Sequence, residues 1–148
     1  MKKAFTILEL VVVLSVLVIL IGIAIPRIKG MQDSAKIVQA KAELQTMQIA
    51  IESYYNNSSP HAYPGPDGLI ASPCGVFSAA TPQIVPGNCP TDPFTTNSQY
   101  ALAVTGNYYV FASVGVAGAD LSSLSIDSTG LVGGGNGGIC ATNGTGCS

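Results

Sequence analysis

The sequence predicts an α+β fold in which one long N-terminal helix packs on a small antiparallel sheet. Two observations carry this prediction. The first is a run of 21 residues, Phe5–Ile25, that holds a single charge and is followed by an amphipathic stretch. The second is a set of short β-rich segments between turn signals in the second half of the chain. At 148 residues, the chain suits one domain and an appendage.

The charges are distributed unevenly along the chain. It is 47% hydrophobic and only 9% charged, against about 25% charged residues in an average soluble domain. All six Lys and Arg residues lie at or before Lys41, whereas six of the eight acidic residues follow it. The part after Lys41 is therefore mildly acidic and offers no basic surface for phosphates, so we expect no direct binding to nucleic acid.

The apolar run Phe5–Ile25 is long enough to cross a membrane. As a helix it would span about 30 Å, and the preceding Lys2 and Lys3 orient its start toward the cytoplasm. Three interpretations compete: a signal peptide cleaved after Ala24, a plain membrane anchor, and a segment that is cut before the run and keeps it. Glu9 favours the third, because a carboxylate inside a spanning helix costs a few kcal/mol and usually marks function.

An amphipathic helix follows the apolar run. Pro26 lacks a backbone N–H, so we expect it to kink or locally melt the helix. A cluster of helix breakers at residues 56–60 predicts the end, so that one near-continuous helix runs from about Thr6 to Tyr55. Apolar residues with 3-4-3-4-3 spacing predict the stripe that packs on the globular part. This stripe is Ile37, Ala40, Leu44, Met47, Ile51 and Tyr54.

The second half of the chain predicts the sheet. Three or four antiparallel strands should pack one face on the helical stripe. The Pro- and Gly-rich segment 61–91 is expected to be a long connecting loop, and the glycine run 133–138 a flexible one. The predicted strands are, in chain order, Tyr100–Val104, Tyr108–Val114, Leu121–Ile126 and Leu131–Val132.

All four cysteines lie in this loop-rich part. Four cysteines allow three pairings, of which we favour Cys74–Cys89 and Cys140–Cys147; each bond would contribute roughly 2–3 kcal/mol to stability. Disulfides imply an oxidising compartment, the periplasm or the cell surface. The alternative is four reduced, buried thiols. No Cys-x-x-Cys pair occurs and the single His61 is not spaced to join the cysteines, which argues against zinc.

The N-terminal residues resemble a known superfamily. A short basic leader precedes a small residue, a Phe-Thr pair, an acid four positions beyond the Phe, a long aliphatic run and a proline. These features are Lys2-Lys3, Ala4, Phe5-Thr6, Glu9, residues 10–25 and Pro26. On these residues the chain resembles the type IV pilins and the type II secretion pseudopilins. Their processing pattern usually has Gly at the position of Ala4, and Ala is the nearest substitute in size.

The resemblance implies a polymerisation mechanism. A prepilin peptidase would cut between Ala4 and Phe5 and methylate the new Phe5 amine, and the subunit would wait in the inner membrane. An assembly platform would then add it to a helical homo-oligomeric filament. Glu9 would pair with the Phe5 amine, because pairing offsets the cost of both charges in an apolar environment. Around Pro26 the family often loses helicity in the filament. The implied organisation is a leader (1–4), a membrane and filament-core helix half (5–26), an amphipathic helix half (27–57) and a globular β-domain (58–148).

Two members of the superfamily compete as the particular function. The loop from Cys140 to Cys147 resembles the disulfide-closed terminal loop of many type IV pilins, so our first expectation is a major pilin of a cell-surface pilus. Other stretches look like the major pseudopilin of type II secretion, whose periplasmic filament drives protein export. These stretches are Tyr63-Pro64, Asp67-Gly68-Leu69, Asp92-Pro93-Phe94 and Ser113-Val114-Gly115. A minor pilin for adhesion or DNA uptake is the third alternative, and the missing basic surface argues against DNA.

Calcium is the one cofactor that the resemblance suggests. The major pseudopilins carry calcium in the loop after the corresponding strand, where Asp120 and Asp127 could offer oxygen ligands in this chain. Two carboxylates are few, and the alternative is two turn residues. The sequence shows no nucleophile–base pair, no metal-ligand cluster and no paired acid–base carboxylates. We therefore expect neither catalysis nor any other cofactor.

Overall fold

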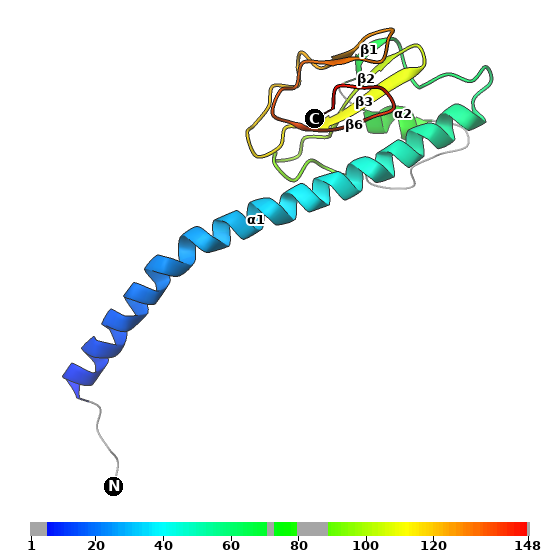
Figure 1. Ribbon diagram of the computed structural model, residues 1–148. Helices are drawn as coiled ribbons and strands as arrows, with labels where there is room; N and C mark the ends of the chain where they lie inside the picture. Colours follow the sequence, from blue (N-terminus) through cyan, green and yellow to red (C-terminus); the bar gives the residue numbers. More distant parts are fainter. Residues whose placement is uncertain (1–5, 71–72, 80–88, 148) are drawn as a thin grey trace. The chain divides into compact units, whose positions relative to one another are not determined.

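The structure, a computed structural model, describes residues 6–70, 73–79 and 89–147. The chain divides into two compact units, Met1–Ala35 and Lys36–Ser148. A long N-terminal helix and a small antiparallel sheet confirm the predicted α+β, pilin-like fold (Figure 1). The elements are α1 Ile7–Asn57, β1 Gly68–Ile70, α2 Pro73–Ala79, β2 Ala101–Thr105, β3 Tyr108–Ser113, β4 Ser125–Ile126, β5 Val132–Gly133 and β6 Ile139–Thr142.

Helix α1 is the predicted N-terminal helix, with both ends close to those expected. It ends at Asn57, inside the breaker cluster 56–60. The Ser58 hydroxyl donates to the Tyr55 carbonyl at 3.0 Å and so satisfies one of the carbonyls that a helix end leaves open. The helical backbone also continues through Pro26. The local melting expected there is absent from this structure, because the i to i−4 bonds on both sides of one missing N–H can hold the helix together.

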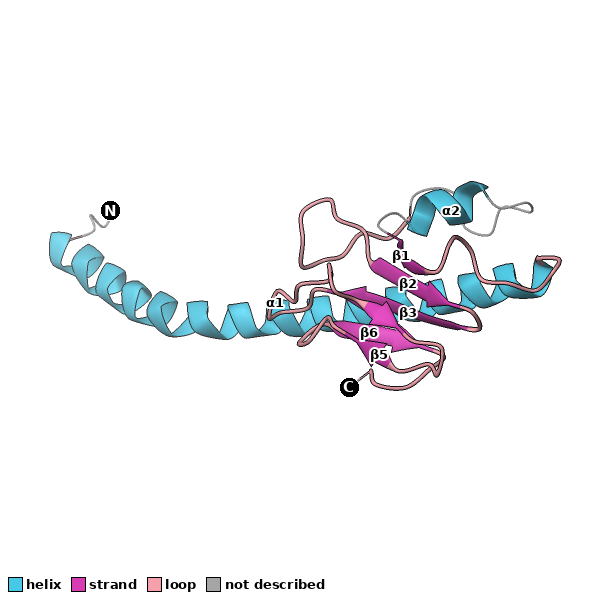
Figure 2. Cartoon of the chain, turned by 90° about the horizontal axis from the view of Figure 1, so that it is seen from above, coloured by secondary structure: helices cyan, strands magenta, loops and turns pink. Residues whose placement is uncertain are grey.

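Four strands form one antiparallel sheet in the order β1-β2-β3-β6 (Figure 2). β2 and β3 pair in register up to Thr105 and Tyr108, so the turn between them is Gly106-Asn107. Gly106 adopts a φ of 56°, the positive value that the first central position of a type II′ turn requires and that glycine adopts without strain. This hairpin confirms the first predicted strand pair. β4 and β5 form a separate two-stranded sheet at the second predicted hairpin. Its strands are shorter than predicted, and the expectation that they join the sheet packed on the helix is wrong, because their apolar residues cover the opposite face of the β2–β3 hairpin.

The hairpin of β2 and β3 contributes side chains to two apolar clusters, one on each face. Successive side chains of a strand point to opposite faces, so alternate residues enter different clusters. The cluster on the α1 side contains Ala40, Leu44, Met47, Ile51, Tyr63, Phe77, Tyr100, Leu102, Val104, Tyr109 and Phe111. The cluster on the other face contains Ala103, Val110, Ala112, Leu124 and Ile126. The α1 residues of the second unit therefore cover one face of the sheet, and β4 covers the other.

The predicted helical stripe is confirmed in its centre and differs at its ends. Four of its residues are buried in the α1-side cluster, with Ala40 and Ile51 at 0% exposure. Tyr54 lies outside this cluster, and the neighbouring Tyr55 packs against it instead. The Tyr55 ring lies 4.8 Å from the Tyr63 ring, centroid to centroid. The stripe turns toward Tyr55 because the segment after the helix supplies an aromatic partner that helical periodicity does not reveal.

The segment 61–91 holds more structure than the long loop expected there. Strand β1 pairs with β2 at the sheet edge. Helix α2 inserts Phe77, a fully buried side chain whose ring centroid lies 6.2 Å from that of Phe111. These elements have only 3 and 7 residues, which is too short for periodicity to reveal them. Tertiary packing, rather than local pattern, makes them regular.

The glycine run 133–138 is closely packed against its neighbours, in contrast to the flexible loop predicted. A Cβ atom at Gly138 would lie 2.5 Å from the Ser113 carbonyl oxygen, a distance that no other residue type tolerates. The run leads directly into β6, which pairs with β3 from Ile139–Ser113 onward. Glycine therefore serves here to bring the last strand against the sheet.

Candidate functional site

Helix α1 begins with a cap that places Glu9 in its first turn. The Thr6 hydroxyl oxygen, Oγ1, accepts a hydrogen bond from the Glu9 backbone N–H at 3.3 Å. Thr-x-x-Glu is the spacing of a capping box, a signal for Thr6 that our sequence analysis did not use. A carboxylate in the first turn also lies at the positive end of the helix dipole. Glu9 thus suits the start of this helix as well as the assembly role expected for it.

The first unit exposes apolar side chains on all sides of the helix. From Ile7 to Ile25 the large aliphatic side chains are between 46% and 84% exposed. The most apolar 18-residue stretch of α1 has no buried residue, and the helix is long and apolar enough to cross a membrane. A helix that is apolar all round requires lipid or other apolar helices around it. Exposure of this segment to water is therefore unfavourable.

The predicted processing residues, Ala4 and Phe5, lie outside the described residues. For Pro26 the structure describes the backbone, which is helical. The roles of Ala4 and Phe5 in cleavage and methylation, and of Glu9 and Pro26 in assembly, accordingly remain predictions.

In the second unit, both favoured disulfides are present. Cys74 of α2 bonds Cys89, with the Cα atoms 5.8 Å apart, and Cys140 of β6 bonds Cys147, with the Cα atoms 5.6 Å apart. No cysteine is free, so the alternative of four reduced thiols is wrong. The first bond ties α2 to the segment that leads into Thr91, and the second closes the C-terminal loop on the edge of the sheet.

Backbone bonds of Thr145 and side-chain bonds of Asn143 hold the C-terminal loop on both sheets. The Thr145 carbonyl accepts from the Val132 N–H at 2.9 Å, and the Thr145 N–H donates to the Gly130 carbonyl at 2.7 Å. The Asn143 side-chain oxygen accepts from the Tyr109 N–H at 2.9 Å, and its amide nitrogen donates to the Asn107 carbonyl at 2.9 Å. The loop therefore joins β5 to the β2–β3 hairpin, and the disulfide is one of several constraints on it.

Two carboxylates of α1 accept hydrogen bonds from tyrosines of the globular domain. The Tyr100 hydroxyl donates to Glu43 Oε2 at 2.5 Å, and the Tyr63 hydroxyl donates to Glu52 Oε1 at 3.1 Å. Burial raises the pKa of Tyr100 well above its ordinary value, and the Glu43 carboxylate raises it further. Burial and Glu52 raise the pKa of Tyr63 and Tyr109 in the same way. These bonds fix the second half of α1 on the globular domain at two points, Tyr100 directly before β2 and Tyr63 in the segment before β1.

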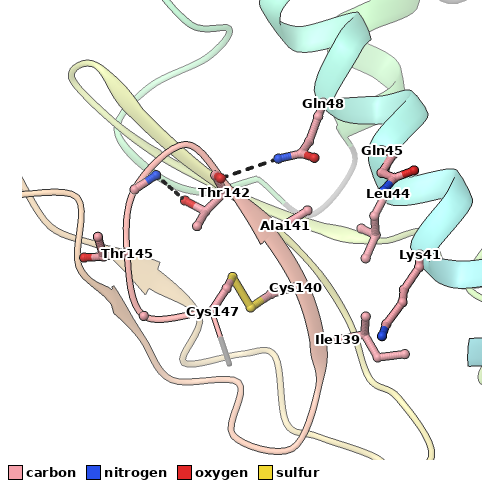
Figure 3. A pocket seen from close by; sticks show the side chains of 12 residues that line it. Lys41, Leu44, Gln45, Gln48, Ile139, Cys140, Ala141, Thr142, Thr145 and Cys147 are labelled. Atoms are coloured by element: carbon pink, nitrogen blue, oxygen red, sulfur yellow. Dashed lines mark hydrogen bonds between the residues drawn. A yellow bond between two sulfur atoms is a disulfide. The ribbon is translucent and has the colours of Figure 1, made fainter.

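A groove lies between α1 and the C-terminal loop (Figure 3). Its volume is about 430 Å³. The Gln48 amide nitrogen reaches across it to the Thr142 carbonyl at 3.5 Å. The lining is mixed in character: Lys41, Gln45 and Gln48 from the helix, Ile139 and Thr142 from β6, and Thr145 from the loop. Lys41 is the one cation of this lining.

The two aspartates considered for calcium are held in their own turns. Asp120 Oδ1 accepts from the Ser122 N–H at 2.9 Å, and Asp127 Oδ1 accepts from the Thr129 N–H and hydroxyl at 2.8 and 2.6 Å. These bonds lower the pKa of both carboxyl groups. Within residues 6–70, 73–79 and 89–147, no group of three or more His, Cys, Asp or Glu side chains could hold a metal ion. A calcium site at Asp120 and Asp127 stays a prediction.

A capped apolar helix with an acid in its first turn, followed by a small sheet domain, defines a pilin-like subunit. Residues 27–128 match the family described as type II secretion system (T2SS), protein G. The chain is also 29% identical, over 129 residues, to the type II secretion system core protein G of Pseudomonas aeruginosa, a match that covers 85% of this chain and 84% of that protein. No solved structure matches the chain. The chain therefore belongs to the type II secretion protein G family, within the pilin and pseudopilin superfamily.

This membership changes the order of the two functions expected from the sequence. The match falls on the pseudopilin side of the superfamily, which was our alternative, and gives no specific support to a cell-surface type IV pilus. The disulfide-closed loop at Cys140–Cys147, which had favoured the pilus, is present in the structure. A loop closed in this way stabilises the end of any such domain in an oxidising compartment, so it discriminates poorly between pilin and pseudopilin.

Proposed function

We propose that this chain is the major pseudopilin of a type II secretion system, a structural subunit that polymerises into a periplasmic filament and drives protein export. The observation that carries the proposal is the match of residues 27–128 to type II secretion protein G. The exposed apolar helix supports it, because such a helix needs lipid before assembly and neighbouring helices after it.

The membrane stage depends on the sequence of the first unit. Lys2 and Lys3 keep the leader in the cytoplasm, and Ile7–Ile25 spans the inner membrane. The globular domain then faces the periplasm, where its two disulfides form. A prepilin peptidase cuts between Ala4 and Phe5 and methylates the Phe5 amine, and the subunit waits in the membrane for the assembly platform.

The assembly stage depends on Glu9. Its carboxylate lies in the first helical turn, within the part of the chain that is otherwise apolar. In an apolar environment an unpaired carboxylate and an unpaired amine are both costly, and an ion pair offsets much of that cost. Pairing Glu9 with a Phe5 amine therefore favours subunit addition and sets the axial position of the new subunit. Pro26 allows the helix to lose local structure in the filament.

The proposed function is tested by deleting the gene in its own host and overexpressing it in the same strain. For a major pseudopilin, the deletion should leave exported proteins in the periplasm, and overexpression should give thin filaments that contain this chain by peptide mass spectrometry. Normal export by the deletion strain would refute the proposal. Abundant surface filaments built of this chain, together with normal export, would instead establish the type IV pilus.

A further inference from the structure

Two cations follow the apolar helix surface directly. Arg27 and Lys29 come shortly after Ile25, still within α1, and both side chains are exposed. Across residues 6–70, 73–79 and 89–147, no Lys or Arg nitrogen lies within 4.0 Å of a carboxylate oxygen. This includes the carboxylate of Asp33, the one acid of the first unit after the apolar run. Within the described chain, the two charges are therefore free for a partner from outside.

The height of this pair along the helix corresponds to the phosphate layer of a membrane. At about 1.5 Å per residue, the segment from Ile7 to Ile25 is about 28 Å long, close to the thickness of the hydrocarbon core of a bilayer. Arg27 and Lys29 then lie about 3 and 6 Å past Ile25, and the headgroup layer of one leaflet is about 5–8 Å thick. Long basic side chains at this level reach polar headgroups while their methylene groups stay against the apolar layer.

The two cations lie on opposite sides of the helix. An α-helix turns by about 100° per residue, so positions two apart differ by about 200° and share no face. The apolar side chains next to them, Ile28 and Met31, are 51% and 72% exposed. A partner that surrounds the helix, as lipid does, can reach both cations, whereas one flat protein surface would meet only one of them.

The side of the membrane on which the pair lies calls for a stabilising partner. In the proposed orientation Arg27 and Lys29 are translocated, and basic residues there work against the orientation that Lys2 and Lys3 favour. Cleavage then removes Lys2 and Lys3, which leaves Arg27 and Lys29 as the basic residues closest to the span. Guanidinium and ammonium groups both bind phosphate oxygens, and phospholipids present phosphates at this depth on every side of a spanning helix.

We propose that Arg27 and Lys29 bind the phosphates of anionic phospholipids in the periplasmic leaflet while the subunit is stored in the membrane. The proposal rests on the proposed function, because it requires Ile7–Ile25 to span the inner membrane. Arg27 offers a planar fork that suits two phosphate oxygens, and Lys29 offers a point charge to a second lipid on the other side of the helix. These contacts hold the helix at one depth and are released when the subunit enters the filament.

Mass spectrometry of the intact full-length chain in detergent, with equal amounts of phosphatidylglycerol and phosphatidylcholine added, tests the proposal. Both lipids carry a phosphate, but only phosphatidylglycerol has a net negative charge, so we expect the chain to retain it preferentially. Arg27→Gln/Lys29→Gln should lower the bound phosphatidylglycerol at least about fivefold, the factor expected for losing the attraction of one such cation to an anionic membrane surface. The bound phosphatidylcholine should stay unchanged.

Two matched variants and one competitor separate charge, position and source of the phosphate. Arg27→Lys/Lys29→Arg keeps both charges and should keep the preference. Lys41→Gln removes a cation about 18 Å farther along α1 than Lys29, beyond the roughly 10 Å over which a charge acts at 0.1 M salt, and should keep it too. Inorganic phosphate at the lipid concentration should displace no phosphatidylglycerol, because it has no acyl chains to hold it at that depth.

Four outcomes would overturn the proposal: no lipid preference of the wild-type chain, an unchanged preference of Arg27→Gln/Lys29→Gln, an equal loss from Lys41→Gln, or displacement of the lipid by inorganic phosphate. Each of these leaves the export and filament assays untouched, so the proposed function would stand. Normal export by the deletion strain would refute the proposed function, and the lipid preference could still be measured because it needs only the spanning helix.

Discussion

Glu9 is the one charged side chain within the exposed apolar part of α1, and its position decides what it can do. In the first helical turn, capped by Thr6, the carboxylate lies at the favourable end of the helix dipole. That benefit is below the few kcal/mol that a charge costs inside a membrane. A partner amine in the filament would offset most of the cost of the Glu9 charge. Pairing would therefore favour transfer of the subunit from lipid into the filament.

Glu9→Ala should leave membrane insertion intact and abolish most filament assembly. The substitution removes the charge that is proposed to pair with Phe5 but keeps the apolar helix. The measurement compares the amount of chain in the membrane fraction with the amount in sheared filaments. Glu9→Asp is the control that keeps the carboxylate and should retain partial assembly. Filaments of normal yield from Glu9→Ala would remove this residue from the mechanism.

Tyr100→Phe should destabilise the domain by about 1.5–3 kcal/mol, because it removes a hydrogen bond to a charged group. The same bond makes stability depend on alkaline pH. The pKa of Tyr100 is raised by burial and by Glu43, so its contribution is complete below about pH 10, the ordinary tyrosine value, and is lost as pH rises further. Thermal unfolding of the full chain in detergent at pH 8 and pH 11 measures both effects. Tyr54→Phe, outside the core cluster, should change stability by less than about 0.5 kcal/mol.

At the residue scale the sequence was informative where a local pattern exists. Glu9 stands out as the single charge in an apolar run, and the Cys140–Cys147 pair closes a local loop that resembles the terminal loop of many type IV pilins. The bond between Tyr100 and Glu43 joins residues 57 positions apart, and nothing local marks either as a partner. The groove around Lys41 could not be predicted either, because its lining residues are far apart in the sequence and form a groove only once β6 lies beside α1.

At the element scale, the second half of α1 is defined by the difference between its buried and exposed faces. Leu44 is 1% exposed and packs on the sheet, whereas Ile49 is 73% exposed. Leu44→Ala should therefore cost about 2–5 kcal/mol of stability through lost packing and the cavity left behind. Ile49→Ala, the matched surface change, should cost less than about 0.5 kcal/mol. Denaturant unfolding of the full chain in detergent measures both, and equal effects would contradict this assignment of the helix faces.

Replacing Cys140 and Cys147 together with Ser should lower stability by roughly 2–3 kcal/mol, the value for a loop of this size in the chain-entropy model. The loop should keep its place on the sheets, because the backbone bonds of Thr145 and the side-chain bonds of Asn143 remain. Denaturant unfolding under oxidising conditions measures the loss. A variant as stable as the wild type would show that these hydrogen bonds alone determine the loop.

Elements with a clear period could be predicted, and short ones could not. The helix and the β2–β3 hairpin follow from spacing and from turn chemistry at Gly106. By contrast, α2, β1 and β6 are short, and their residues become regular only through packing and pairing with β2 and β3. The glycine run before β6 indicates flexibility from its composition alone, yet Gly138 serves close packing against Ser113.

At the scale of the whole molecule, the chain combines an apolar helix, whose exposure to water is unfavourable, with a small stable domain. The helix surface between Ile7 and Ile25 requires lipid or other apolar helices around it. The disulfides and the covered sheet allow the domain to persist outside the cytoplasm. The choice between pilus and pseudopilus could not be made from these properties, because both polymers need them; the family match over residues 27–128 favours the pseudopilus.

The intact mass of the mature protein, with sequencing of its first residues, tests the central claim most directly. The claim is that the apolar helix stays on the subunit and carries Glu9 into a filament. The account predicts a chain that begins at Phe5 with a methylated amine and retains residues 5–148. A mature chain that begins at Ile25, or one that still begins at Met1 within assembled filaments, would contradict it.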